Sequence, residues 1–174
     1  MNNKPKILYE KYKELVFNVA LHYTQNIEDA EEITQDVFIS IFENIKDFRE
    51  ESTLKTWAYR ITINKSLDFL KSKKRLKRIF FFKSLKIDDQ EKKISIPEIN
   101  HPGVILENKE SVNAIFNGIN KLPSKLKTVI ILLKIEGRSQ KETAKIMQLS
   151  VKAIESLFHR AKKKLAVILK DNER

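Results

Sequence analysis

The residues best suited to contact another molecule lie near the end of the chain, on two helices predicted between Ser139 and Lys164. Ser139 and Glu142 match a capping box, in which each side chain satisfies a backbone N–H at the start of the first helix. The second helix of such a pair can enter the major groove of DNA. Candidates for base contacts are Lys152, Glu155, Ser156 and His159, and candidates for phosphate contacts are Arg160, Lys162, Lys163 and Lys164. The alternative is a helical hairpin with a solvated basic face.

A second group of polar side chains lies on a helix predicted from about Thr53 to Lys71. Its polar face is expected to carry Tyr59, Arg60, Asn64, Lys65 and Lys71. Binding of single-stranded nucleic acid requires planar groups that stack on bases, next to cations that contact phosphates. An ordinary charged surface is the alternative, and Trp57 is expected in the core.

A third group is acidic and lies on the predicted second helix, opposite its apolar stripe. Its members are Glu28, Glu31, Glu32, Gln35, Asp36 and Glu43. Carboxylates at helical spacing can bind a metal or transfer protons, but no histidine stands at ligand spacing beside them. A solvated face, or a docking face for a basic protein, is therefore expected.

Catalytic chemistry has little support in the sequence. The absence of cysteine excludes a disulfide, a thiolate zinc site and a thiol nucleophile, and it suits a reducing compartment. His22, His101 and His159 are scattered, and no phosphate-binding glycine loop appears. We therefore expect a protein that is not an enzyme and has no catalytic residue, no metal and no cofactor.

The charge of the 174-residue chain is divided into blocks. Residues 1–53 hold six basic and eleven acidic side chains, residues 54–87 hold eleven and one, and residues 111–174 hold fourteen and five. This segregation indicates two surfaces for polyanions and an acidic surface with another use. Because no apolar signal core and no run of eighteen apolar residues occurs, we expect a cytoplasmic protein without membrane insertion.

Apolar spacings of three and four residues predict an all-α chain with two small domains. A first helix runs through Leu8 and Tyr23, a second begins at Asn26 as its N-cap, and the helix after Thr53 completes a first domain over residues 1–75. The second helix has an apolar stripe of Ala30, Ile33, Val37, Phe38, Ile41 and Ile45.

Periodicity fades over residues 76–109, which contain two prolines and a glycine and are expected to form an irregular linker. Residues 110–174 are expected to form the second helical domain. Ser124 and Ser150 are predicted N-caps there, and Gly137 is a predicted helix end.

Three motifs resemble the extracytoplasmic-function (ECF) sigma factors of the sigma-70 family. Residues 29–38 resemble the polymerase-binding segment of their region 2. Residues 48–61, followed by Asn64 and Asp68, resemble the segment that melts and reads the minus-ten promoter element. Leu122-Pro123, residues 136–139 and residues 159–165 resemble region 4, which reads the minus-thirty-five element. The resemblance covers about residues 8–75 and 110–170, in the order of the family.

The resemblance implies a region 2 helical bundle, a region 4 helix-turn-helix domain and a role for each face. The residues implied in binding core RNA polymerase are Asp29, Glu32, Gln35 and Asp36. Those implied in binding the melted minus-ten DNA are Phe48, Arg49, Ser52, Tyr59, Arg60, Asn64, Lys65, Lys71 and Arg75. Those implied in binding the minus-thirty-five duplex are Ser139, Lys152, Glu155, Ser156, His159, Arg160 and Lys163.

The partners implied by the resemblance are core RNA polymerase, promoter DNA and an anti-sigma factor. The family often reads Thr-Val-Lys-Ser-Arg where residues 153–157 read Ala-Ile-Glu-Ser-Leu, so the resemblance does not carry over a promoter sequence. Two alternatives stay open. An autonomous helix-turn-helix regulator would leave the acidic helix and the linker without a role, and an enzyme on nucleic acid, such as a recombinase, would need a nucleophile that the sequence does not offer.

Overall fold

The computed structural model describes residues 4–48, 52–84 and 109–172. Helices joined by short turns make up these ranges, and no strand occurs within them. The predicted all-α fold class is therefore confirmed. Arg49, His101 and most of the predicted linker lie outside the described residues.

Three helices form the first domain: α1 (Lys4–Thr24), α2 (Ile27–Asn44) and α3 (Leu54–Ser84), with a 3-10 turn, η1 (Ile45–Asp47), after α2. Asn26 caps α2 as predicted, because its Oδ1 accepts a hydrogen bond from the Asp29 N–H at 2.7 Å. The core between the helices consists of Tyr12, Val16, Ala20, Leu21, Ala30, Ile33, Val37, Phe38, Ile41 and Ala58. Most of the predicted apolar stripe of α2 therefore faces this core.

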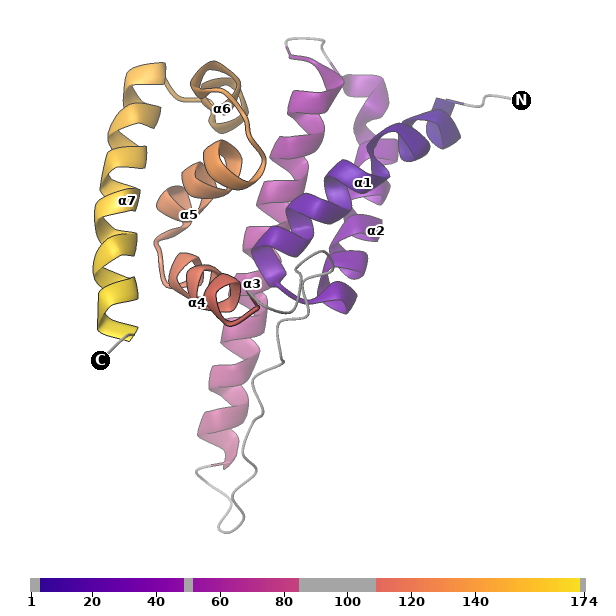
Figure 1. Cartoon of the computed structure of the whole chain (residues 1–174). Coiled ribbons are helices and arrows are strands. Elements are labelled where there is room, and N and C mark those ends of the chain that lie inside the picture. The colour runs from indigo at the N-terminus through magenta and orange to yellow at the C-terminus, as the bar shows by residue number, and fades with distance from the viewer. Residues whose placement is uncertain (1–3, 49–51, 85–108, 173–174) are drawn as a thin grey trace.

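Helix α3 is longer than the sequence predicted. Its end was expected near Lys71, and an irregular linker was expected from residue 76, but the helix continues to Ser84. The lysine-rich run is compatible with a helix, and no glycine or proline interrupts the backbone hydrogen bonds along the whole of α3. The last turns project away from the other helices (Figure 1), and Leu76, Ile79 and Phe80 are exposed there.

The second domain contains α4 (Lys109–Asn120), α5 (Ser124–Ile130), a π-helical turn η3 (Ile131–Ile135), α6 (Gln140–Met147) and α7 (Val151–Asn172). Gly137 follows η3 with a φ of +61°, a conformation that favours glycine. Ser139 caps α6 through both bonds of the predicted capping box, and Ser150 Oγ accepts from the Ala153 N–H at 3.2 Å. The prediction for Ser124 is wrong, because Pro123 is the N-cap and Ser124 is the first helical residue.

The two domains pack against each other along α3, which lies between α1 and α2 on one side and the later helices on the other (Figure 1). One apolar cluster joins both domains. Its buried members in the first domain are Val19, Tyr23, Tyr59 and Ile63, and those in the second are Phe116, Ile119, Leu122, Leu126, Val129, Ile130, Ile131, Leu132, Ala144, Ile146, Ile154 and Ala161. Helix α3 thus has two buried faces, and this contact between the domains was not predicted from the sequence.

The first prediction concerns Ile154, which is fully buried on α7. Ile154→Ala is expected to lower the free energy of unfolding by about 2–5 kcal/mol, because it removes buried methyl groups and leaves a cavity. The matched variant Ile39→Ala removes the same atoms at an exposed site on α2 and should change this free energy by about 0.5 kcal/mol or less. Urea denaturation followed by circular dichroism measures both, and equal losses would contradict this core.

Candidate nucleic-acid interface

The outer face of α7 carries the residues predicted to read duplex DNA. Six of the seven lie on this helix, and all six are exposed: Lys152, Glu155, Ser156, His159, Arg160 and Lys163. The seventh, Ser139, is exposed at the start of α6, where its Oγ accepts from the Glu142 N–H at 3.2 Å and its N–H donates to Glu142 Oε2 at 2.8 Å. Spacings of three and four residues place these six side chains on one face of α7, and Ser139 holds the start of α6.

A large cavity opens where α3 begins, between the two domains. Its volume is about 1170 Å³, and its walls include Phe48, Ser52 and Arg60 from the first domain with Arg138 and Lys145 from the second. The ring of Phe48 packs on Trp57, with centroids 5.2 Å apart. Four of the residues predicted to bind melted DNA, Phe48, Ser52, Tyr59 and Arg60, thus line a space with an aromatic wall and cationic side chains.

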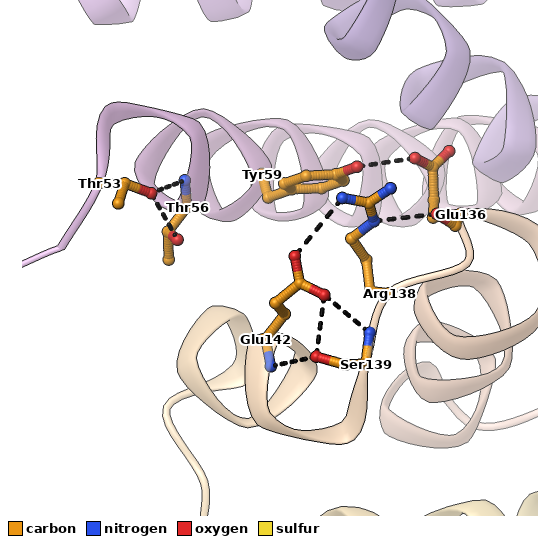
Figure 2. A network of polar contacts seen from close by, with 7 residues as sticks. All are labelled: Thr53, Thr56, Tyr59, Glu136, Arg138, Ser139 and Glu142. Atoms are coloured by element: carbon orange, nitrogen blue, oxygen red, sulfur yellow. Dashed lines mark hydrogen bonds and ion pairs between the residues drawn. The ribbon is translucent and has the colours of Figure 1, made fainter.

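Tyr59 does not lie where the sequence predicted. It was expected on the polar face of its helix, but it is 2% exposed, because the turn before α6 packs over it. Its hydroxyl donates to Glu136 Oε2 at 2.8 Å (Figure 2). Arg60 next to it donates from Nη2 to the Lys145 carbonyl at 2.8 Å. The expected polar surface of α3 is therefore partly an interface between the domains.

Glu136 is the centre of a polar network at this interface. His22 Nδ1 lies 2.8 Å from its Oε1. The Tyr59 hydroxyl donates to its Oε2, and the Arg138 Nε donates to its carbonyl oxygen at 2.9 Å (Figure 2). Burial acts to raise the pKa of the Glu136 carboxyl, but the hydrogen bonds from His22 and Tyr59, with the His22 and Arg138 charges, lower that pKa below its ordinary value. Burial and the Glu136 charge raise the pKa of the Tyr59 hydroxyl.

Sequence reasoning gave neither Glu136 nor His22 a role. Glu136 was seen only as part of a four-residue motif, and His22 was only one of three scattered histidines. No sequence signal joins them, because they belong to different domains and meet only through the packing along α3. Arg138 was also missed; its guanidinium lies 6.0 Å from the centre of the Tyr59 ring and 3.5 Å from the Glu142 carboxylate.

The basic part of α3 continues the candidate interface beyond the contact with the second domain. Asn64, Lys71 and Arg75 are exposed and Lys65 is half-buried, so all four can be reached from solvent. Lys71 donates to Asp68 at 3.0 Å, a pair between two exposed side chains. These residues stay available to a ligand while Tyr59 does not.

The acidic face of α2 carries most of its predicted residues toward solvent. Glu32, Gln35 and Asp36 are exposed on it. Asp29, the fourth residue predicted to bind polymerase, is half-buried and forms an ion pair with Lys73 of α3. Asp29 therefore stabilises the first domain, and three of the four predicted residues are free of such a contact in the part of the chain that the structure describes.

Comparison with protein families assigns both domains. Residues 8–76 match the family model described as Sigma-70 region 2, and residues 113–165 match the one described as Sigma-70, region 4. The chain belongs to the sigma-70 family. The two matched segments correspond to the bundle with the acidic helix and to the domain with the helix-turn-helix.

Relatives of known function place this sigma factor in the ECF group and confirm the resemblance seen in the sequence. The ECF RNA polymerase sigma factor SigW of Bacillus subtilis (strain 168) is 29% identical over 164 residues, which cover 92% of this chain and 86% of SigW. A sigma factor of this group is a promoter-specific transcription initiation factor, and the family is not one of enzymes.

Solved structures of sigma factors share the fold of this chain. CnrH, solved in complex with the cytosolic domain of CnrY, has a TM-score of 0.65 at 21% identity, over 98% of this chain and 90% of that chain. RpoE of Bartonella quintana, solved with the anti-sigma factor NepR, has a TM-score of 0.63 at 20% identity, over 97% and 98%. Within the described residues of this sigma factor, no helix is long and apolar enough to cross a membrane, and no group of three or more His, Asp or Glu gathers as a metal site.

The second prediction follows from the lowered pKa of Glu136. Glu136→Gln is expected to lower the free energy of unfolding at pH 7 by roughly 1–3 kcal/mol, because His22 and Tyr59 lose a charged acceptor. A carboxyl whose pKa is lower in the folded chain stabilises it above the unfolded pKa of about 4.3 and loses this effect as the pH falls. The difference between the two proteins should therefore shrink below about pH 4 in urea titrations.

The exposed Glu155 provides the control for this measurement. Glu155→Gln removes the same charge from α7, where Glu155 has no described contact to the other domain. The free energy of unfolding of this variant should stay within about 0.5 kcal/mol of the wild type at pH 7 and below about pH 4. A loss for Glu136→Gln that is independent of pH would show that the carboxylate does not hold this interface.

Proposed function

We propose that this sigma factor binds core RNA polymerase, directs it to a set of promoters and helps to open the DNA. The observation that carries the proposal is the presence, on one chain, of an exposed acidic helix face, an aromatic-lined cavity and an exposed polar helix-turn-helix face, in the order of the family. The three surfaces suit three different partners: a protein, a melted strand and a duplex.

The face of α7 is proposed to bind the minus-thirty-five element as duplex DNA. A recognition helix reads base edges near its N-terminus, where Lys152, Glu155 and Ser156 are exposed. His159 is the fourth candidate for a base edge, and Arg160 and Lys163 lie further along the helix, where cations contact phosphates. Ser139 at the start of α6 is proposed to contact the backbone of the same duplex.

The first-domain wall of the cavity at the start of α3, with Phe48 and Ser52, is proposed to bind a base of the melted minus-ten element. Extruding a base costs a few kcal/mol of stacking and pairing, so a site that promotes melting must offer replacement contacts. Phe48 and Ser52 line the cavity, and Arg49 follows Phe48 in the sequence. The strand would then follow Asn64, Lys65, Lys71 and Arg75 along α3.

Tyr59 and Arg60 can join this strand only after the second domain leaves α3. Both now contact that domain, through Glu136 and the Lys145 carbonyl. We therefore propose that the packed arrangement is a form of the free protein and that the two domains separate on the promoter.

Two protein partners are proposed as well. Glu32, Gln35 and Asp36, with Asp29 beside them, would dock on core RNA polymerase, because exposed carboxylates at helical spacing fit a basic surface. An anti-sigma factor is proposed because the similar sigma factor RpoE of Bartonella quintana was solved with one, NepR. The face of α2 is acidic whereas the proposed promoter surfaces are basic, so one chain can bind polymerase and DNA at the same time.

The third prediction tests this function directly. Run-off transcription with purified core polymerase that lacks a sigma factor, on a library of genomic promoters, is expected to give discrete start sites only when this protein is added. Glu32→Lys/Asp36→Lys should abolish these starts, because it reverses the charge of the docking face, whereas Glu10→Lys on the exposed part of α1 should retain them. Circular dichroism checks that each variant is folded.

Absence of starts with a folded wild-type protein would reject the proposal. If the wild-type protein also bound duplex DNA tightly and specifically without polymerase, the proposed function would change to that of an autonomous regulator. Retained starts with Glu32→Lys/Asp36→Lys would reject only the assignment of the acidic face.

The fourth prediction concerns the phosphate contacts of α7. Each cation that neutralises a phosphate adds close to one unit to the slope of the logarithm of affinity against the logarithm of salt concentration. Lys163→Gln is therefore expected to weaken promoter binding by the assembled polymerase complex and to reduce this slope by about one, for all promoters alike. Lys170→Gln, also exposed on α7 but near its far end, should leave the slope unchanged, and equal slopes for all three proteins would contradict the contact.

A further inference from the structure

A second, smaller cavity lies at the contact between the domains. Its volume is about 300 Å³, and three parts of the chain form it: the end of α1, the middle of α3, and the end of α4 with the start of α5. Its polar lining includes Tyr23, Asn120 and five lysines. None of the promoter contacts proposed above, except that of Lys71, falls on this cavity.

The charge around this cavity is entirely positive. Five lysines line it and no carboxylate does. Lys73 pairs with Asp29 and Lys71 with Asp68, so these two charges are compensated. For Lys74, Lys77 and Lys127, no carboxylate partner occurs in the ranges that the structure describes. Among the described residues, three cations therefore surround one small space without a counter-charge.

Lys127 is the most enclosed of the cations that line this cavity. Its side chain is 4% exposed, and its Nζ donates to the Tyr23 carbonyl at 2.9 Å and to Asn120 Oδ1 at 2.6 Å. An ammonium has three donors, so one remains for the cavity that Lys127 lines. Burial, with the nearby Lys74 charge, lowers the pKa of Lys127 to about 8. Its Nζ also lies 5.1 Å from the centre of the Tyr23 ring, but none of these neighbours carries a full negative charge, so an anion in the cavity would stabilise the charged form of Lys127.

We propose that this cavity binds a small anion with two linked phosphate groups. Its volume is at the lower end of the range for small-molecule sites, about 300–1,000 Å³, which suits a diphosphate group better than a large ligand. A diphosphate carries a charge comparable to that of the three uncompensated lysines. A DNA backbone fits less well, because a duplex phosphate cannot reach an ammonium as enclosed as that of Lys127.

Binding of this anion is coupled to the arrangement of the domains. Lys74 and Lys77 belong to the first domain and Lys127 to the second, so the complete site exists only while the domains are packed together. A ligand that binds one arrangement more tightly shifts the population toward it. The anion therefore holds the second domain on α3, and in this position the second domain covers Tyr59. Because Tyr59 is proposed to contact melted DNA, an effect of the anion on promoter opening rests on the proposed function, but the binding of the anion does not.

The fifth prediction is a binding measurement on the full chain without polymerase. Isothermal titration with inorganic pyrophosphate at fixed ionic strength is expected to show one saturable site. Lys74→Gln/Lys77→Gln should weaken this affinity by about tenfold or more, because two charged hydrogen bonds are lost. The control Lys141→Gln/Lys170→Gln removes the same charge at exposed sites outside the cavity and should bind like the wild type. Equal affinities for the two double variants would overturn the proposal.

Other ligands identify the chemistry and its source. Orthophosphate should bind more weakly than pyrophosphate, and equal binding would overturn the assignment of a diphosphate. Tighter binding of ADP than of pyrophosphate would support a nucleotide as the source, and tighter binding of pyrophosphate would support the free anion. If Lys74→Gln/Lys77→Gln loses affinity for a DNA duplex but not for pyrophosphate, the cluster is a nucleic-acid contact and the proposal fails.

The coupling has its own readout. Because the chain has no cysteine, Glu43→Cys/Asp171→Cys provides one labelling site in each domain, both exposed. Pyrophosphate is expected to narrow the distribution of energy transfer between two dyes at these sites, and Lys74→Gln/Lys77→Gln should abolish this response. Binding without any change in energy transfer would overturn the coupling. Neither experiment contains polymerase or promoter, so failure here is distinct from failure of the proposed function.

Discussion

Helix α3 packs on two sides, and the arrangement of the whole chain depends on this double burial. One face completes the bundle with α1 and α2, and the other supports the second domain. At Tyr59 the ring belongs to the shared apolar cluster while the hydroxyl is held by Glu136. A tyrosine enclosed in this way cannot stack on a base, so domain packing and the proposed contact with melted DNA compete for the same helix face.

The polar contacts give this interface its register. Apolar burial is non-directional, but the hydrogen bonds of Tyr23 to Thr128, of Tyr59 to Glu136 and of Arg60 to the Lys145 carbonyl fix how the second domain sits on α3. Each contributes on the order of 1 kcal/mol net, because water satisfies the same groups once they are exposed. A macromolecule that offers comparable contacts to the separated domains can therefore displace the packed form.

Local features of the fold could be predicted from the sequence, and contacts between distant segments could not. The caps at Asn26 and Ser139 and the apolar stripe of α2 depend on neighbouring residues, so spacing alone identifies them. Burial of Tyr59 escaped prediction because periodicity assigns one inner face to a helix, whereas α3 has two. Lys127 escaped because lysine is ordinarily a surface residue. Of the proposed site residues, those on α7 are exposed as expected, while their roles stay predictions.

The unbroken course of α3 limits how the chain can change shape. With no glycine or proline from Leu54 to Ser84, the helix offers no hinge, and bending it would break backbone hydrogen bonds. The second domain cannot be released by gradual flexing of its support. It has to detach from the side of a stiff rod, losing the apolar cluster and the hydrogen bonds of Tyr59 and Arg60 in one cooperative step. Separation of the domains, as proposed, is therefore expected to be an all-or-none transition without a populated half-separated form.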